Sequence, residues 1–340
     1  MCIRDRECYM ESVWGVLDFC KVKYMFTGGG KDIQEYFKGF YLSINKVKLE
    51  CVFKTIYVRF IEHDGDLKYE IVEGETTELL PGILFISLKN GKIVCFCKDS
   101  WIIEEKEDLI EVRISGRVLR FLDVLNQCLR DVIIRNARKY DVIGLHAACL
   151  KLTWGNVLLF GLSGSGKSTL SIGAGLYESN RLLSDDRVVL CCYEKHSYIT
   201  SFGFPITFRA GTSKICPELR KYEESVPAIA FSDKEMNYKY KVGVDYYDLF
   251  GYKRIYYLLD NLKCVFLQRD DSGVAGFQKM SDEELKSQLI AYWECGEIVC
   301  DDIELLLDKL KNNSFKYLYP FGGGQAFQDN VQILSNGPLV

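Results

Sequence analysis

The chain has 340 residues and a formal net charge of −4 at pH 7, and 48% of its residues are hydrophobic and 26% charged. This length is comfortable for two domains. The absence of a basic stripe argues against a nucleic-acid partner, and no apolar run approaches the roughly 20 residues that a membrane span needs. We therefore expect a cytoplasmic globular protein with no nucleic-acid or membrane partner.

The fourteen cysteines form no recognisable framework. No CxxC pair occurs, and the chain has only three histidines. Paired metal-ligand spacings are therefore missing. We expect the cysteines to behave as small buried hydrophobic residues in a reducing cytosol.

The first six residues are expected to be foreign to the protein. "MCIRDR" matches the translation of a transposon end that is used to prepare sequencing libraries. We expect residues 1–6 to be a cloning or sequencing scar. A β-rich N-terminal domain is then predicted over residues 7–118.

Residues 40–115 are typical of β-strands. "KTIYVRFIEHDGDLKYEIVEG" places Asp64-Gly65 between two β-rich runs, and "GILFISLKNGKIVCFCKD" places Asn90-Gly91 between two more. Asp-Gly and Asn-Gly are favoured dipeptides of hairpin turns. We therefore predict two hairpins and an antiparallel N-terminal sheet, with no catalytic constellation in it.

A helix is predicted over residues 119–140. Apolar residues recur at helical spacing through "GRVLRFLDVLNQCLRDVIIRNARKY". Arg135, Arg138 and Lys139 in its last turn suit the negative end of the helix dipole. We expect this helix to connect the first domain with a second domain over residues 141–340, where the pattern changes to strand, loop, helix and strand.

The second domain contains a phosphate-binding loop. "GLSGSGKST" fits G-x-x-x-x-G-K-[ST] as Gly161–Ser168. The glycines let the backbone adopt positive φ and approach a phosphate chain, and the loop amides would face it at the start of a helix beginning at Lys167. Lys167 is expected to reach the β- and γ-phosphates, and the Ser168 hydroxyl to coordinate Mg²⁺. A glycine-rich turn with an incidental lysine is the alternative.

Two adjacent acids, Asp185 and Asp186, follow the apolar run "RLLS" eighteen residues after Lys167. A strand there would deliver them to the carboxyl edge of a sheet, beside the phosphates. One carboxylate could hold Mg²⁺, and the other could accept a proton from an attacking hydroxyl. An ordinary acidic turn is the alternative.

His146 stands twenty-one residues before Lys167, on a strand that is expected to end near the same site. It could then hydrogen-bond an aspartate or the transferring phosphate. By contrast, Arg269-Asp270-Asp271 has no phosphate loop near it in sequence, and we expect a simple loop there. "PFGGGQAF", near the C-terminus, is either a lid or a surface loop.

The order of His146-Ala147-Ala148, "GLSGSGKST" and "LLSDD" resembles the HPr kinase/phosphorylase family, and more closely the HPr-kinase-related proteins. The resemblance covers about residues 141–270. It implies a PEP-carboxykinase-like P-loop α/β kinase domain behind the β-rich domain, so that the whole chain is of the α+β class. It also implies assembly into homo-oligomers.

The resemblance implies roles for the motif residues. Lys167 and Ser168 would bind the Mg²⁺-nucleotide, while Asp185 and Asp186 would share metal binding and base catalysis beside His146. Ser168 and Asp185 are our predicted Mg²⁺ ligands, although sequence alone does not divide the two roles between the aspartates. The catalytic residues would be His146, Lys167, Asp185 and Asp186. The residues predicted to bind the nucleotide are Gly161, Ser163, Gly164, Ser165, Gly166, Lys167, Ser168, Thr169 and Arg209.

One departure from the family concerns the substrate. HPr kinases carry a Glu-Arg-Gly signature downstream of the aspartates, where this chain reads "SFGFPITFRAG" with no acid before Arg209. This argues against HPr as the substrate and against the reverse phosphorylase reaction. Arg209 is expected either to steady a transferred phosphate or to lie in solvent.

We therefore expect a kinase that uses ATP or GTP with Mg²⁺ and transfers the γ-phosphate to a hydroxyl. The acceptor is expected to be a serine of a small protein or peptide, with a small molecule as a close alternative. A non-catalytic nucleotide-binding regulatory or scaffold module is the second class. Retention of His146 with both aspartates favours chemistry, because binding alone needs only the loop. ABC-type ATPases are rejected, since the chain has no LSGGQ-like signature.

Overall fold

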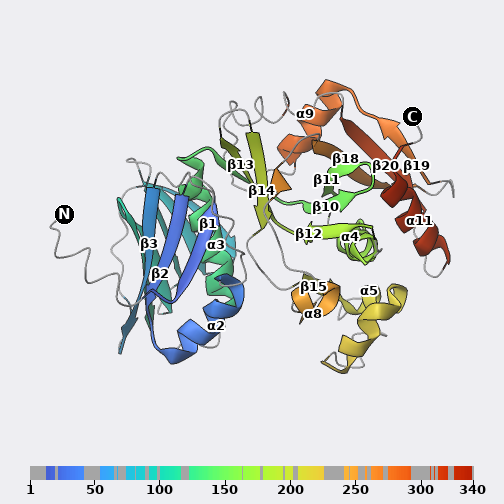
Figure 1. Ribbon diagram of the computed structural model, residues 1–340. Helices are drawn as coiled ribbons and strands as arrows, with labels where there is room; N and C mark the ends of the chain where they lie inside the picture. The colour runs from blue at the N-terminus through green and yellow to red at the C-terminus, as the bar shows by residue number, and fades with distance from the viewer. Residues whose placement is uncertain are drawn as a thin grey trace. The chain divides into compact units, whose positions relative to one another are not determined.

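The computed structural model describes residues 13–19, 22–41, 54–64, 67, 74–80, 82–88, 92–97, 100–115, 122–162, 164–176, 179–193, 196–201, 206–225, 241–244, 246–251, 257–258, 262–270, 275–291, 307, 310, 313–320 and 325–338. The chain divides into two compact units, Met1–Ile143 and Gly144–Val340 (Figure 1). The fold is mixed α/β with large sheets, which agrees with the α+β class. The expected scar over residues 1–6 lies outside the described residues.

The first unit contains an eight-stranded sheet with the order β1-β2-β3-β8-β7-β6-β5-β4, and its described residues also include two helices. The strands are β1 Gly15–Phe19, β2 Val22–Gly28, β3 Lys54–His63, β4 Gly74–Leu80, β5 Ile83–Leu88, β6 Ile93–Cys97, β7 Trp101–Glu105 and β8 Leu109–Ser115, and the helices are α2 Lys31–Tyr41 and α3 Leu122–Arg138.

Both helices cover the same face of this sheet (Figure 1). Alternate residues of β2 and β3 are buried, and the register places Tyr24 beside Ile56 on one face. On that face the Tyr24 hydroxyl donates to Asn136 Oδ1 of α3 at 2.7 Å, and the ring of Phe37 in α2 lies 5.0 Å from that of Phe60. Alternate burial in β2 and β3 thus places their apolar side chains on the face that the helices cover. Ile86, Val94 and Ile102 of β5–β7 form a separate buried cluster.

The two hairpin predictions have different outcomes. β5 and β6 pair antiparallel on either side of Asn90-Gly91, as predicted, although those two residues lie outside the described ones. The hairpin at Asp64-Gly65 is wrong, because β3 is bordered on both edges by parallel neighbours, β2 and β8. Neither edge of β3 is left for the following segment. The sheet is therefore mixed rather than antiparallel.

α3 lies within the predicted helical range and packs on β6 and β7 of the first unit. Arg135, which we expected to serve the helix dipole, places its guanidinium 4.1 Å from the centre of the Phe85 ring. Asn136 and Lys139 both donate to Oε1 of the buried Glu105, each at 2.5 Å. Packing and buried polar contacts together attach α3 to this sheet.

The second unit is built on a six-stranded sheet with the order β12-β10-β11-β18-β20-β19, beside sheets of order β17-β14-β13-β9 and β15-β16. The strands are β9 Val142–Leu145, which begins just before the boundary of the unit, β10 Ala148–Leu152, β11 Gly155–Phe160, β12 Arg181–Ser184, β13 Val188–Tyr193, β14 His196–Ser201, β15 Ile206–Arg209, β16 Lys241–Val244, β17 Tyr257–Leu258, β18 Leu262–Arg269, β19 Gly276–Lys279 and β20 Ser314–Tyr319. The helices are α4 Lys167–Gly175, α5 Ala210–Ile215, the 3₁₀ helix η2 Pro217–Ser225, α8 Tyr246–Phe250, α9 Asp282–Ala291 and α11 Gln325–Asn336.

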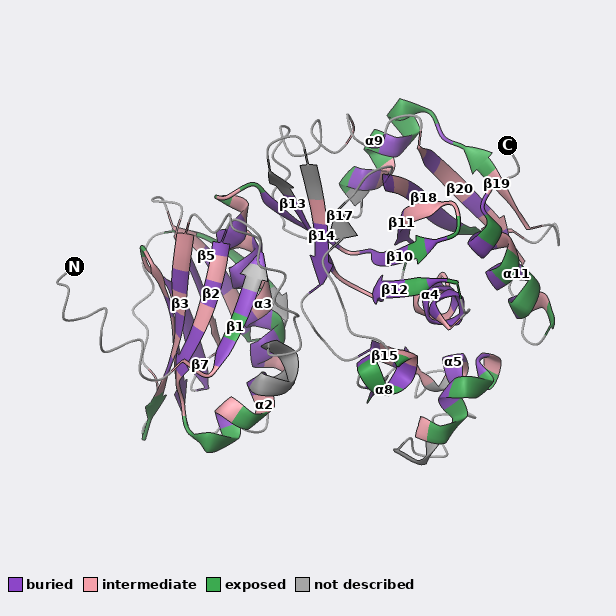
Figure 2. Ribbon diagram, viewed as in Figure 1, coloured by how far each residue is buried: buried purple, intermediate pink, exposed green. Residues whose placement is uncertain are grey.

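In the six-stranded sheet, β11, β18 and β20 run parallel, and β10 and β19 are each antiparallel to a neighbour. α4 contacts β10, β11 and β12 on one side and α11 on the other, and it is buried from Leu170 to Gly175 (Figure 2). At Gly173 a side chain would meet Phe327 and Val331 of α11, so glycine permits the close approach of the two helices. The helix that follows the phosphate loop is thus held within the core of its unit.

Two further expectations concern composition. The seven cysteines whose side chains the structure describes are all free, and six of them are buried. Among the described residues, no helix combines the length and the apolar character needed to cross a membrane.

Candidate functional site

The predicted phosphate-binding loop, called the phosphate loop below, connects β11 with α4, and α4 begins at Lys167 as predicted. Gly164 and Gly166 have φ values of 80° and 87°, which residues other than glycine rarely adopt. Gly161 differs from our expectation because its φ is not positive; there a Cβ atom would collide with the Ser165 hydroxyl. Ser163 lies outside the described residues.

The N-terminus of α4 is open to an anion. Gly166 caps this helix without a side-chain hydrogen bond, and no acidic residue lies in its first turn. The first turn of the helix therefore supplies no carboxylate of its own to offset the partial positive charge of the helix end. The geometry fits a phosphate group, which such helix ends bind through backbone amides.

The two aspartates lie in a turn between β12 and β13. They follow β12, as predicted, and the strands on either side of the turn belong to different sheets. The Ser184 hydroxyl donates to the Arg187 carbonyl at 2.5 Å and closes the turn. Because β12 and β11 are both antiparallel to β10, Asp185 and Asp186 follow the same edge of the sheet as the phosphate loop.

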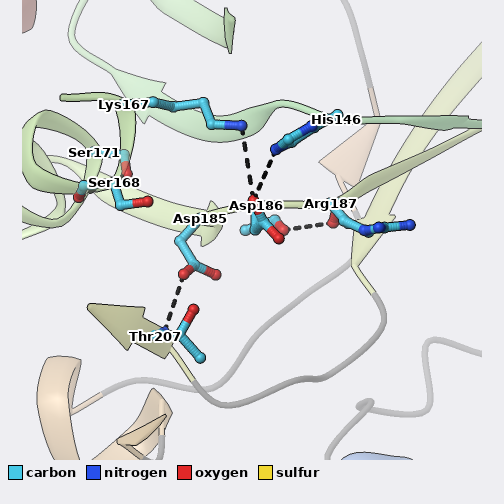
Figure 3. Close-up of polar contacts among 9 residues, drawn as sticks. His146, Lys167, Ser168, Ser171, Asp185, Asp186, Arg187 and Thr207 are labelled. Atoms are coloured by element: carbon cyan, nitrogen blue, oxygen red, sulfur yellow. Dashed lines mark hydrogen bonds and ion pairs between the residues drawn. The ribbon is translucent and has the colours of Figure 1, made fainter. Parts of the chain in front are cut away.

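Asp185 and Asp186 have different environments (Figure 3). Asp185 is only 5% exposed, and its Oδ2 accepts the backbone N–H of Thr207 in β15 at 3.1 Å. Asp186 Oδ1 lies 3.0 Å from Nε2 of His146 and 3.8 Å from Nζ of Lys167. The structure therefore brings His146, Lys167 and Asp186 together, whereas the buried Asp185 contacts β15.

His146 lies in a bend between β9 and β10 rather than within a strand. Burial alone would raise the pKa of Asp186, but the hydrogen bond from His146 and the positive charge of Lys167 outweigh it, so that this pKa lies well below its usual range. The carboxylate is therefore ionised, and the His146 Nε2–H donates to it. The side chains of His146 and Asp186 are 41% and 42% exposed, which leaves both accessible to a substrate.

The remaining predicted residues are distributed around this centre. The Ser168 hydroxyl projects toward the space beside the aspartates (Figure 3). The Thr169 hydroxyl lies 3.0 Å from the Thr212 hydroxyl and links α4 to α5. Arg209 is the last residue of β15, two positions beyond Thr207, so the strand that holds Asp185 also carries Arg209.

The oxygen donors of the described residues suit a metal ion that is also held by phosphate groups. Among the described residues, no group of three or more His, Cys, Asp and Glu side chains is placed to hold a metal ion. Mg²⁺ in nucleotide sites usually takes one or two protein oxygens together with phosphate oxygens and water. The Ser168 hydroxyl and an aspartate carboxylate are oxygen donors of this kind, so the site fits an ion that arrives with phosphates.

Arg269 is a site residue that the sequence reasoning missed. Its Nη2 donates to the carbonyl oxygen of Gly164 at 2.7 Å, whereas we had expected a loop unrelated to the phosphate site. β18 pairs parallel with β11, which brings its last residue to the edge that carries the phosphate loop. The apolar run "LKCVFL" before Arg269 was the available signal, because parallel buried strands end at a common edge.

No protein-family model and no curated protein matches the chain. Among solved structures, the chain is similar to the HPr(Ser) kinase/phosphatase from Coxiella burnetii, with 15% sequence identity and a TM-score of 0.28. That match covers 57% of this chain and 94% of the other. The likeness is distant, so the chemistry of the site must be judged from its own geometry.

Proposed function

We propose that the second unit is a phosphotransferase that binds the phosphates of ATP or GTP on the loop Gly161–Ser168 and transfers the γ-phosphate to a hydroxyl group. One observation carries this proposal: the half-exposed carboxylate of Asp186 lies 3.8 Å from Lys167 Nζ and accepts a hydrogen bond from His146. A site that only bound nucleotide would not need an oriented acid beside its phosphate-binding lysine.

Asp186 is the proposed general base. It must be ionised to accept the proton of an attacking hydroxyl, and its environment keeps it so. In the nucleotide-free protein, Lys167 and His146 also make it a weak base. Binding of phosphates would share the charge of Lys167 and so raise the basicity of Asp186 when the substrate is present.

Asp185 is proposed to hold the site in shape rather than to transfer a proton. Its contact with Thr207 N–H ties the acidic turn to β15. Ser168, together with one of the aspartates, would hold Mg²⁺, which would supply positive charge to the phosphate oxygens. His146 would keep Asp186 oriented toward the acceptor.

The acceptor is proposed to be a serine of a small protein or peptide, or a hydroxyl of a small molecule. The half-exposed side chains of His146 and Asp186 leave room for either to approach.

The test is a transfer assay with Mg²⁺ and labelled ATP or GTP, using peptides, small proteins and small molecules as acceptors. Wild type should transfer label, Lys167→Ala should lose nucleotide binding, and Asp186→Asn should bind nucleotide without transferring label. Binding without transfer to any acceptor in wild type would favour a regulatory or scaffold module instead. Absence of nucleotide binding in wild type would overturn the proposal altogether.

A further inference from the structure

Three parallel strands end around the phosphate loop. β11 leads into the loop, β18 pairs with β11, and β20 pairs with β18. Arg269 and Tyr319, the last residues of β18 and β20, are partners in register, and Asp270 N–H donates to the Tyr319 carbonyl at 3.1 Å. The sheet therefore presents an arginine and a tyrosine side by side at the edge where phosphates would bind.

Arg269 holds the loop at Gly164. Its guanidinium donates to the Gly164 carbonyl at 2.7 Å, while Ser165 N–H donates to the Leu162 carbonyl at 2.9 Å. A carbonyl oxygen engaged by a cation outside the loop is not directed at the anion site. This orientation favours a concave backbone whose successive amides can face a phosphate.

Tyr319 supports the same loop at Gly166. It is buried, and its hydroxyl oxygen would lie 2.6 Å from a Cβ atom at Gly166. Its ring stacks on that of Tyr317, with 5.7 Å between centroids and 7° between planes. Burial raises the pKa of Tyr319, and the nearby charge of Arg269 opposes this rise. A side chain at Gly166 would therefore collide with this tyrosine, which limits how closely the loop can approach β20.

We propose that Arg269 is a positioning residue of the phosphate site: supported by Tyr319, it fixes the Gly164 carbonyl and thereby sets the affinity of the loop for nucleotide. Arg269 acts through the loop backbone and takes no part in the transfer itself. The proposal rests on the proposed function, since it concerns the affinity of the same loop.

The test measures the nucleotide dissociation constant by calorimetry, and KM and kcat in the transfer assay, for wild type, Arg269→Ala and Arg269→Lys. Arg269→Ala should weaken nucleotide binding about 10- to 100-fold, as expected for one hydrogen bond to a charged group. KM should rise by the same factor, with kcat unchanged at saturation. Arg269→Lys should retain part of the affinity, because lysine can donate a single hydrogen bond. Low millimolar guanidinium should partly restore binding in Arg269→Ala.

A matched control is Arg220→Ala, which removes an exposed guanidinium from η2. It should bind nucleotide as wild type does. If wild type binds nucleotide and Arg269→Ala binds it equally well, the positioning role is overturned while the proposed function stands. A fall in kcat at unchanged affinity would also overturn it, because Arg269 would then act on the transferring phosphate. Failure of wild type to bind nucleotide would instead count against the proposed function.

Discussion

Asp185 and Asp186 are neighbours in the chain, but their carboxylates have different partners: Thr207 N–H at 3.1 Å for the first, and His146 at 3.0 Å for the second. The first is buried and serves the backbone of another strand. The second is half-exposed and lies beside Lys167. The two members of this acidic pair, which we expected to share metal binding and base catalysis, thus lie against different parts of the second unit.

This division predicts unequal effects on phosphotransfer. Asp186→Asn should lower kcat about 10²- to 10⁴-fold, the range for loss of a general base. Asp185→Asn should have a much smaller effect, because asparagine can still accept the Thr207 N–H. Transfer rates at saturating nucleotide decide the point. Equal losses in the two variants would contradict the division of roles.

Asp185 should matter more for stability. In Asp185→Ala the Thr207 N–H loses its acceptor, and the free energy of unfolding should fall by about 1–3 kcal/mol. Asp185→Asn should lose less. Urea denaturation measures both, with Asp329→Ala as the control, because Asp329 is exposed and its loss should cost at most about 0.5 kcal/mol. A stability unchanged in Asp185→Ala would show that the contact with β15 is dispensable.

The lowered pKa of Asp186 predicts a pH dependence of stability. The folded protein binds this proton more weakly than the unfolded chain, whose aspartates titrate near pH ~4. The ionised carboxylate therefore stabilises the fold above about pH 4, and this contribution is lost as pH falls below that value toward the folded pKa. Because the side chain is 42% exposed, we expect less than about 1 kcal/mol.

The measurement compares the unfolding free energies of wild type and Asp186→Asn between pH 7 and pH 3. Their difference should shrink below about pH 4. The same comparison in a His146→Ala background should show a weaker pH dependence, since the hydrogen bond that lowers the pKa is gone. A difference that stays constant down to pH 3 would contradict the assigned electrostatics.

Gly166→Ala should lower the free energy of unfolding by more than the positive φ of Gly166 alone explains. Gly82 provides the control, because its φ of 81° is similar but a Cβ atom there would meet nothing within 4 Å. Gly82→Ala should cost about 1–2 kcal/mol of unfolding free energy. Gly166→Ala should cost more, because the methyl group meets the Tyr319 hydroxyl, and Tyr319→Phe in that background should recover part of the loss. Equal costs at the two glycines would show that Tyr319 does not constrain the loop.

Local signals in the sequence were sufficient for local structure. The contiguous pattern Gly161–Ser168 predicted a loop between a strand and a helix, and Asn90-Gly91 predicted the pairing of β5 with β6. Each of these features is specified by residues close together in the chain, so propensity and spacing carry the information.

Distant pairings could not be inferred in this way. The parallel neighbours of β3 come from separate parts of the chain, and they occupy both edges of β3, one of which the expected hairpin would need. The contact between Arg269 and Gly164 depends on the pairing of β18 with β11, and the orientation of Asp185 depends on β15. The sequence predicted that both aspartates belong to the site, but it could not predict which of them would be buried.

The positions of Arg269 and Tyr319 in the sequence determine when, during translation, they can contact the phosphate loop. A ribosome completes the motif Gly161–Ser168 long before it reaches β18 and then β20. Until Arg269 and Tyr319 have left the exit tunnel and joined the sheet, the nascent loop has neither of its two supports. The proposed nucleotide binding would therefore become possible only late in synthesis, and a chain that ended before β20 would contain the motif without these two contacts.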